Sequence, residues 1–397
     1  MLLYIHVPFC RSRCRYCAFH SVALGKGVQA EHSAAVHSYC RTVLCEMQAW
    51  AAHRGKLEVE SIFFGGGTPS LLPAQALGQL VEEAHRLFAV HPEAEISMEA
   101  NPESLTSKEQ ACACRAAGIN RLSLGVQSMD DAFLRILGRA HKAQDVVQAV
   151  SYARLAGISN INLDLMWALP QQSVAHWLHT LRQVLRLQPE HISAYALTLE
   201  EGTALAQEVD TGLFAQPDEA VQSAMFLEGA ALLAEAGFTQ YEISNFARAG
   251  FACRHNQGYW QGQDYLGLGP AATSTMAGRR WTNPSNQGAW EKAVQAHSLD
   301  AAPELLSPLN RVLEMIMLRL RTSRGLRLAD YTALTGLDFM ASHAALVQAL
   351  REHDLICLHE GCLCLTQQGM LLSNSIISSI FEITEQKLCA RGWEEAL

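Results

Sequence analysis

Short apolar stretches alternate with amphipathic stretches along the first half of the chain. The amphipathic ones, such as 75–88, 145–157 and 174–188, carry apolar residues at helical spacing. The apolar stretches have the length of β-strands and cover residues 2–7, 60–65, 95–101, 121–127, 160–166 and 191–197. Alternation of strands and helices predicts a parallel sheet with right-handed crossovers. Six units are too few for a closed eight-stranded barrel, so the pattern predicts an α/β fold with a partial (β/α)6 barrel.

Three of the predicted strands are polar along one face, although parallel strands are usually apolar on both faces. These polar faces carry Ser97, Glu99 and Asn101 in the third strand, Ser123, Gly125 and Gln127 in the fourth, and Asn160, Asn162 and Asp164 in the fifth. We expect the apolar faces to pack against helices and the polar faces to line a hydrated concave interior. The cysteines, the glycine run and the polar residues that we take as functional candidates also lie at the carboxyl ends of strands, where barrels of this kind have their sites.

The strand–helix alternation stops near residue 215. A predicted helix over 219–236 leads into a segment rich in Gly and aromatic residues, and a predicted hairpin turns at Glu360-Gly361. Helices followed by a hairpin are typical of a winged helix. We therefore expect a barrel over 1–215, an accessory segment over 216–300, a winged-helix-like C-terminal domain over 301–383 and a loosely held tail over 384–397.

Composition narrows the function classes. The chain has 397 residues, 49% of them hydrophobic, and a net charge of -9, which argues against a nucleic-acid-binding protein. Residues 305–383 hold six Lys and Arg against seven Asp and Glu, so the winged-helix-like region is not expected to bind DNA. No apolar run approaches the roughly 20 residues that span a bilayer, and the cysteine spacing is not that of a disulfide scaffold. We expect a cytoplasmic protein.

Cys10, Cys14 and Cys17 follow the first predicted strand with the spacing C-x3-C-x2-C. Thiolates at this spacing on a loop can converge on one iron–sulfur cluster. Three thiolates leave one iron of a four-iron cluster without a protein ligand, and an open metal position leaves room for a reactant. A zinc site that borrows His6 or His20 is the alternative, but neither histidine has a familiar zinc-finger spacing.

This loop, with Tyr16 before its last cysteine, resembles that of the radical S-adenosylmethionine (SAM) superfamily. The resemblance implies a [4Fe–4S] cluster whose open iron binds SAM. The run GGGTP follows the second strand and resembles the SAM amino-group site of the superfamily, which implicates Gly66, Gly67 and Thr68. A tight turn is the alternative interpretation of the glycines.

The chain also resembles one branch of the superfamily, the oxygen-independent coproporphyrinogen III oxidase-like proteins, from residue 4 to about residue 380. The phrases GVQSMDDAFLRILGRAH, NINLDLMWALPQQS and YEISNFA carry this resemblance. It implies SAM contacts at Tyr4, Glu99, Gln127, Arg139 and Asp164.

Two functions compete within this branch, decarboxylation of coproporphyrinogen III and haem delivery by HemW-type haem chaperones. The decarboxylase has an N-terminal arm before its cluster and a cysteine two positions after the third ligand. Here nine residues precede Cys10, and Phe19 stands at the second position. The segment CRHNQGYW resembles the H-N-x-x-Y motif of the chaperones, which makes His255 a candidate haem ligand. The alternative is a histidine hydrogen-bonded within a Gly-rich loop.

We therefore predict a haem chaperone with a [4Fe–4S] cluster, SAM and haem, and keep a radical SAM enzyme acting on a porphyrin as the alternative. The resemblance implies haem-acceptor proteins as partners, including respiratory, membrane-associated ones that the protein would meet at the inner membrane. Nucleic acid is not an expected partner, and a homodimer stays open.

Overall fold

One large sheet runs through the computed structural model, which describes residues 1–25, 30–300 and 302–393. Its central parallel strands are β1 (Leu2–Val7), β4 (Glu58–Gly66), β5 (Ala89–Ala100), β6 (Arg121–Gln127), β7 (Asn160–Trp167) and β8 (His191–Ala196). Further strands extend it at both sides: β9 (Thr239–Gln240), β10 (Asn245–Ala247), β11 (Tyr265–Leu268), β12 (Thr273–Met276), β13 (Arg279–Thr282) and β14 (Glu304–Leu305). The order is β14-β13-β12-β11-β1-β4-β5-β6-β7-β8-β10-β9. The predicted α/β class and partial barrel are confirmed.

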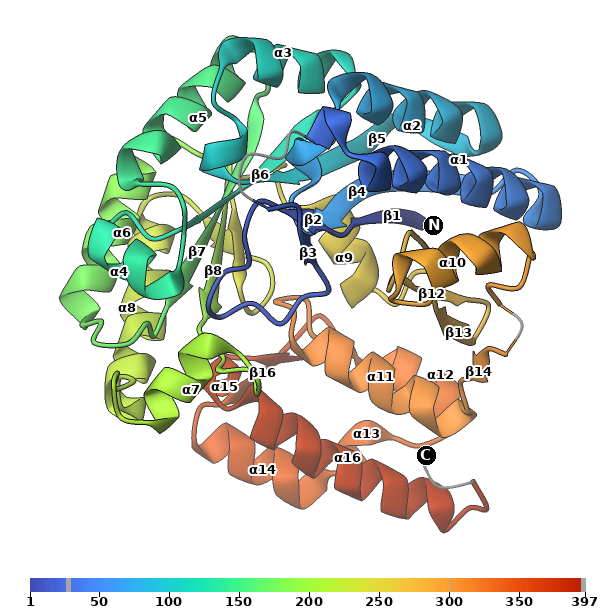
Figure 1. Ribbon diagram of the computed structural model, residues 1–397. Helices are drawn as coiled ribbons and strands as arrows, with labels where there is room; N and C mark the ends of the chain where they lie inside the picture. The colour runs from blue at the N-terminus through green and yellow to red at the C-terminus, as the bar shows by residue number, and fades with distance from the viewer. Residues whose placement is uncertain (26–29, 301, 394–397) are drawn as a thin grey trace.

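Helices cover the convex face of the sheet (Figure 1). They are α1 (Ala34–Arg54), α2 (Ala74–Leu87), α3 (Lys108–Ala116), α5 (Ala143–Leu155), α6 (Val174–Leu185) and α8 (Glu219–Glu235). Capping residues set several of their starts, for example Ser173, whose side chain accepts a hydrogen bond from the backbone N–H of His176. The largest cluster of buried apolar side chains lies between these helices and the sheet, and it includes Met98, Leu122 and Ile161.

Shorter elements connect these strands and helices. They are β2 (Phe9–Cys10), β3 (Val22–Ala23), the 3-10 turns η1 (Ala30–His32), η2 (Pro69–Leu71) and η3 (Pro102–Ser104), and the helices α4 (Asp131–Leu137), α7 (Ala204–Asp210), α9 (Arg254–Trp260) and α10 (Gln287–Gln295). Helix α9 packs against β4, where the His255 ring stacks on Phe63 with centroids 5.0 Å apart.

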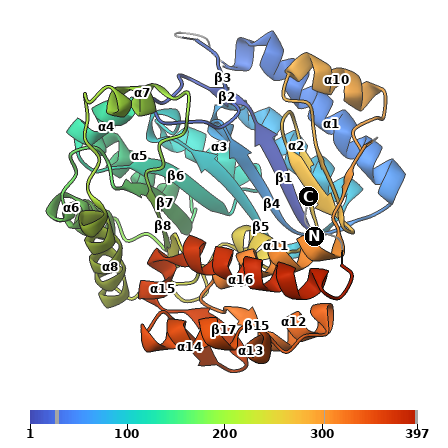
Figure 2. The ribbon, with the colours of Figure 1, turned by 90° about the horizontal axis from the view of Figure 1, so that it is seen from below.

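The C-terminal region has its own apolar core below the barrel (Figure 2). It contains α11 (Pro308–Leu320), β15 (Leu326–Arg327), α12 (Leu328–Thr335), α13 (Phe339–Ser342), α14 (Ala344–Glu352), β16 (Ile356–His359), β17 (Cys362–Leu365), α15 (Gln367–Leu371) and α16 (Ser373–Cys389). The predicted hairpin turns at Glu360 and Gly361, whose φ angles of 49° and 77° suit a two-residue turn between antiparallel strands. The hairpin strands β16 and β17 form a three-stranded sheet with β15. Helices that lead into such a hairpin make a winged-helix-like unit.

Two features differ from the sequence-based expectations. Strand β11 pairs in parallel with β1, so the sheet continues beyond residue 215, where the alternating pattern stops. A strand of four residues that contains Gly267 is too short to show a periodic pattern. Helix α16 also continues through Cys389 and buries Leu388 completely, so this part of the expected loose tail is held by packing. Residues 394–397 of that tail lie outside the described residues.

Candidate functional site

The polar strand faces meet in one cavity of about 200 Å³, which we call the inner cavity. It is lined by Tyr4, Phe63, Glu99, Arg121, Ser123, Asn162, Asp164, Ser193, Tyr195, His255, Asn256 and Tyr259. Four of the residues singled out in the sequence, Tyr4, Glu99, Asp164 and His255, thus lie around the same space. Parallel strands and α9 bring them together because the concave face of a six-stranded barrel is narrow.

Asp164 lies at the centre of a hydrogen-bond network in this cavity. Ser123 Oγ donates to its Oδ2 over 2.8 Å, and Asn162 Nδ2 donates to its Oδ1 over 2.8 Å. Burial raises the pKa of Asp164, and these donated hydrogen bonds oppose the shift because they stabilise the carboxylate. The network fixes the direction of a carboxylate that faces the cavity.

Glu99 links the inner cavity to the glycine run. The backbone N–H of Gly66 donates to Glu99 Oε2 over 3.0 Å. Burial, followed by the negative charge of Asp164, raises the pKa of Glu99 to about 7. The pair therefore changes charge near neutral pH, and a cationic ligand between the two carboxylates would favour the ionised form of both.

Arg121 is a cavity residue that the sequence reasoning missed. Its guanidinium is fully buried, and its Nε has no hydrogen-bond partner among the described residues. Among the described residues that line the inner cavity it is the only Lys or Arg, and Glu99 and Asp164 line the same space. Arg121 shares the strand face of Ser123, so the same two-residue alternation that predicted the polar face could have found it.

His255 lies in the floor of the inner cavity and is 1% exposed. Its Nδ1 shares a hydrogen bond of 2.9 Å with Ser61 Oγ, whereas its Nε2 has no partner among the described residues. Burial, and secondarily the charge of Arg121, lowers the pKa of His255 to about 3. The imidazole is therefore neutral at physiological pH, and a proton on Nδ1 leaves the lone pair of Nε2 free for a ligand.

The three cysteines lie on one loop beside this cavity. Thr68 Oγ1 contacts Cys10 Sγ at 3.7 Å, and Arg139 Nη1 donates to Cys14 Sγ over 3.4 Å. The backbone N–H of Cys17 donates to the carbonyl of Cys14. All three thiols are free and partly buried, and burial, with a smaller contribution from the neighbouring thiols, raises the pKa of Cys10 and Cys17.

The three thiols of this loop are the type of ligand that binds an iron–sulfur cluster. Thiolates are the protein ligands of such clusters, and a metal offsets the mutual repulsion of closely placed sulfurs. In the described part of the chain, no group of three or more His, Cys, Asp or Glu side chains is already gathered as a metal site. The loop thus supplies the kind of ligand that such a cluster requires.

Arg139 and Tyr16 lie between the cysteine loop and the ends of β5 and β6, and Gln127 is the last residue of β6. Arg139 Nη2 donates to the Asn101 side chain and, over 2.7 Å, to the carbonyl of Gly125. Gln127 has a φ of 64° where the pairing of β6 with β7 shifts register, a strained conformation of the kind found at functional sites. The Tyr16 hydroxyl lies close to Arg139, and burial raises its pKa.

The glycine run holds the cysteine loop against the sheet. The N–H groups of Gly67 and Thr68 donate to the carbonyls of Val7 and Phe9, each over 2.7 Å. A Cβ on Gly67 would lie 2.6 Å from the Phe9 carbonyl oxygen, so no other residue fits there without a shift of the backbone. Close packing is thus one reason for the glycines, and it sets the position of Cys10 directly.

Comparisons with known proteins identify the class. A family described as the radical SAM superfamily matches residues 4–184, and the HemN C-terminal domain family matches residues 306–372. Coproporphyrinogen III oxidase from Escherichia coli, a solved structure, shares 22% sequence identity with a TM-score of 0.78, covering 98% of this chain and 90% of that one, which shows the same fold. The chain belongs to the radical SAM superfamily.

Within the superfamily, its relatives include proteins named heme chaperone HemW. Heme chaperone HemW of Synechocystis is 34% identical over 408 residues, which cover 96% of this chain and 97% of that protein. The mitochondrial radical S-adenosyl methionine domain-containing protein 1 of Bos taurus is 36% identical over 392 residues, 95% of this chain and 86% of that protein. Among the described residues, no helix combines the length and apolarity needed to cross a membrane.

Proposed function

We propose that this protein is a haem chaperone that binds a [4Fe–4S] cluster, SAM and haem and passes haem to acceptor proteins. The observation that carries the proposal is the inner cavity, where Glu99, Asp164 and the free Nε2 of His255 face one space beside the cysteine loop. The names of the HemW relatives support it. We place the activity in the cytoplasm, with acceptors that include respiratory proteins at the inner membrane.

The residues take the following roles in this proposal. Cys10, Cys14 and Cys17 would hold the cluster, which when bound offers one iron without a protein ligand to SAM. The other cofactor contacts would come from Tyr4, Tyr16, Gly66, Gly67, Thr68, Glu99, Gln127, Arg139 and Asp164. Arg139 can bind a carboxylate with its fork of N–H groups, and the two acidic side chains can face the cationic part of SAM. His255 is the candidate iron ligand of haem.

One experiment separates the chaperone from an enzyme. The full chain is reconstituted with iron and sulfide under anaerobic conditions and incubated with SAM, a reductant, and either haem or coproporphyrinogen III. We expect a stable haem absorbance that declines when an apocytochrome is added, and no modified tetrapyrrole by chromatography. A decarboxylated or otherwise altered porphyrin that accumulates with turnover would overturn the chaperone function in favour of the enzyme.

The His255 ligand is tested separately. His255→Ala should shift or abolish the Soret band of bound haem because the iron loses an imidazole ligand. The matched control is His85→Ala, an exposed histidine on α2. A Soret band identical in His255→Ala and wild type would move the iron ligand to another residue.

A further inference from the structure

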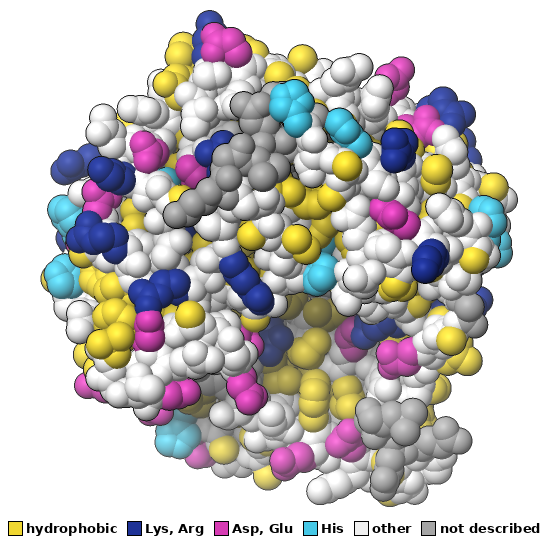
Figure 3. Space-filling view, viewed as in Figure 1, with side chains coloured by type: hydrophobic (Ala, Val, Ile, Leu, Met, Phe, Trp, Pro, Cys, Tyr) yellow, Lys and Arg dark blue, Asp and Glu magenta, His cyan; other side chains and the backbone are white. Residues whose placement is uncertain are grey.

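A second cavity of about 710 Å³, the outer cleft, lies between the barrel and the C-terminal helices. Figure 3 shows the molecule hollowed between these two parts, with hydrophobic side chains at the bottom of the hollow. The cleft is lined by Trp167, Ala194, Tyr195, Ala196, Phe226 and the 242–245 turn from the barrel side, by Asn256, Tyr259 and Trp260 of α9, and by Leu318, Arg321, Met370, Leu371, Ser373 and Asn374 from the C-terminal side. A volume of this order suits a cofactor-sized ligand.

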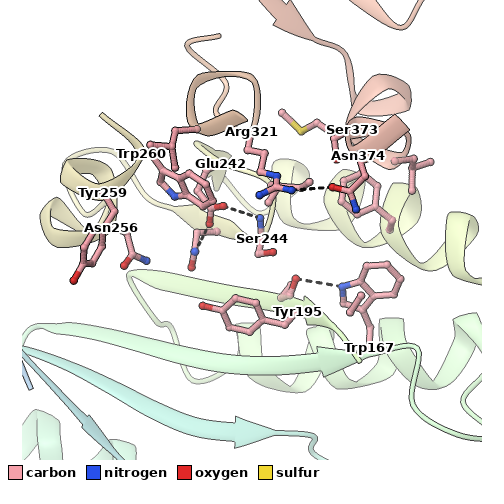
Figure 4. Close-up of a pocket in the computed structure, with 18 residues that line it drawn as sticks. Trp167, Tyr195, Glu242, Ser244, Asn256, Tyr259, Trp260, Arg321, Ser373 and Asn374 are labelled. Carbon is pink, nitrogen blue, oxygen red and sulfur yellow. Dashed lines mark hydrogen bonds between the residues drawn. The ribbon is translucent and has the colours of Figure 1, made fainter. Parts of the chain in front are cut away.

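Aromatic side chains form much of the wall. The Trp167 indole is held in place by a hydrogen bond of 3.2 Å from its Nε1 to the carbonyl of Ala194, and its ring lies 6.1 Å from that of Phe226. Tyr195, Tyr259 and Trp260 add further rings along the cleft (Figure 4). Fixed aromatic faces favour a flat, largely apolar ligand that can stack on them.

A single positive charge faces this aromatic wall. Arg321 is the only basic residue among those lining the cleft, and its Nη2 donates to Asn374 Oδ1 over 2.9 Å (Figure 4). In the described part of the chain it has no carboxylate in ion-pair distance. The one acidic lining residue, Glu242, is 1% exposed and accepts hydrogen bonds from Ser244 and Asn245 instead. The N–H groups of Arg321 that remain can bind a carboxylate of a ligand.

The two cavities share a wall. Tyr195, Asn256 and Tyr259 line both the inner cavity and the outer cleft, and the Tyr259 ring packs edge-on against His255 at 4.9 Å. The inner cavity, at about 200 Å³, is too small for a tetrapyrrole ring, whereas the outer cleft is not. His255 therefore lies behind the cleft and is separated from it by the Asn256 and Tyr259 side chains.

We propose that the macrocycle of haem binds in the outer cleft, stacked on its aromatic wall, with a propionate bonded to Arg321. This assignment rests on the proposed function, and it places haem beside the SAM-facing residues without filling their cavity. Iron ligation by His255 then requires Asn256 and Tyr259 to move aside, so these two residues form a gate between the cleft and the ligand nitrogen.

The test uses the full-length chain titrated with haem and with haem dimethyl ester, in which the propionates carry no charge. Arg321→Gln should weaken haem binding about tenfold, as expected for one charge-assisted hydrogen-bond pair, and should leave the affinity for the ester unchanged. Arg324→Gln, an exposed arginine on the same loop, is the matched control and should bind both as wild type does. Ala196→Trp, at an exposed position that lines the cleft, should weaken binding of both ligands at least tenfold.

Other outcomes overturn the assignment in distinguishable ways. Haem binding as tight as wild type in both Arg321→Gln and Ala196→Trp would exclude the outer cleft and leave the haem chaperone proposal standing. Equal weakening of haem and its ester by Arg321→Gln would overturn the propionate contact. A wild-type chain that binds no haem would overturn the proposed function and the cleft assignment together. Circular dichroism of each variant checks that the fold is intact.

Discussion

The inner cavity and the outer cleft lie side by side but differ in size, polarity and origin. The inner cavity is small and faced by two carboxylates and a buried arginine, and its residues come mostly from successive barrel strands. The outer cleft is more than three times larger, has five aromatic residues in its lining, and forms where the C-terminal helices approach the barrel. The difference in size and lining between these adjacent cavities matches the two unlike ligands that we propose, one small and polar and one large and flat.

The largest expected effect comes from removing a cluster ligand. Cys17→Ser should abolish the cluster, so that the iron bound after anaerobic reconstitution falls from about four atoms per chain to near zero. Haem binding by the variant should persist, because no cysteine is found among the described residues that line the outer cleft. Iron analysis and haem titration measure both.

The control for this substitution is Cys45→Ser, an exposed cysteine of α1. Full iron content in Cys17→Ser would show that the loop does not hold the cluster. Loss of haem binding together with the iron would contradict the assignment of two separate sites, because the cluster and haem would then depend on the same residues.

A buried carboxylate outside both cavities should contribute to the pH dependence of stability. Glu46 is fully buried and accepts hydrogen bonds from Gly269, Asn283 and Trp290, and burial raises its pKa from 4.5 to about 8. The folded protein therefore binds more protons at this residue than the unfolded chain does between these values. The free energy of unfolding should fall as pH rises through that range, by up to several kcal/mol at about 1.4 kcal/mol per unit of pKa shift.

Denaturant titrations between pH 5 and pH 8.5 measure this slope. Glu46→Gln should remove the contribution of this residue and make the fall in stability with rising pH less steep, because the amide does not titrate. An equal slope in wild type and variant would assign the pH dependence of stability to other groups, such as those of the inner cavity.

The smallest expected effect is the pH dependence of SAM binding at the inner cavity. Because the pKa of Glu99 is about 7, its carboxylate is mostly neutral at pH 6 and mostly ionised at pH 8. SAM carries a net positive charge, so its affinity should rise about tenfold over this range. Glu99→Gln should flatten the profile, whereas Glu46→Gln, a buried carboxylate elsewhere, should keep it. Equilibrium dialysis with labelled SAM measures the affinity, and a flat wild-type profile would contradict a role for the Glu99 charge.

Much of the barrel could be predicted from the sequence because its strands carry a local pattern. All six predicted strands are present, with bounds that differ by a few residues at most ends and by more only in β5. The alternation that singled out Glu99 and Asp164 also correctly placed them on the concave face, since a strand turns successive side chains to opposite sides. Strand β11 escaped prediction because four residues carry too little pattern.

The candidate site was only partly accessible to the same reasoning. Arg121 follows the alternation, but it is the first residue of its strand, where an arginine is usually exposed to solvent. Only the structure shows that this side chain is fully buried. His255 was found by its motif, yet nothing in the sequence indicated that it would share a cavity with Glu99. Contacts between β4, β5 and α9 join residues more than 150 positions apart, as the bond from the His255 backbone to Glu95 shows.

The sequence by itself determined the strand–helix order, the placing of three cysteines on one loop, and the polar side chains at alternate positions of the strands. Each of these features is a local pattern of neighbouring residues. Only the tertiary structure decided that α9 packs against β4 beside the inner cavity, that Nε2 of His255 has no hydrogen-bond partner among the described residues, and that Arg321 and Trp167 line one cleft. Those relations depend on how distant segments pack, and packing is set by the summed burial of the whole chain rather than by any one segment.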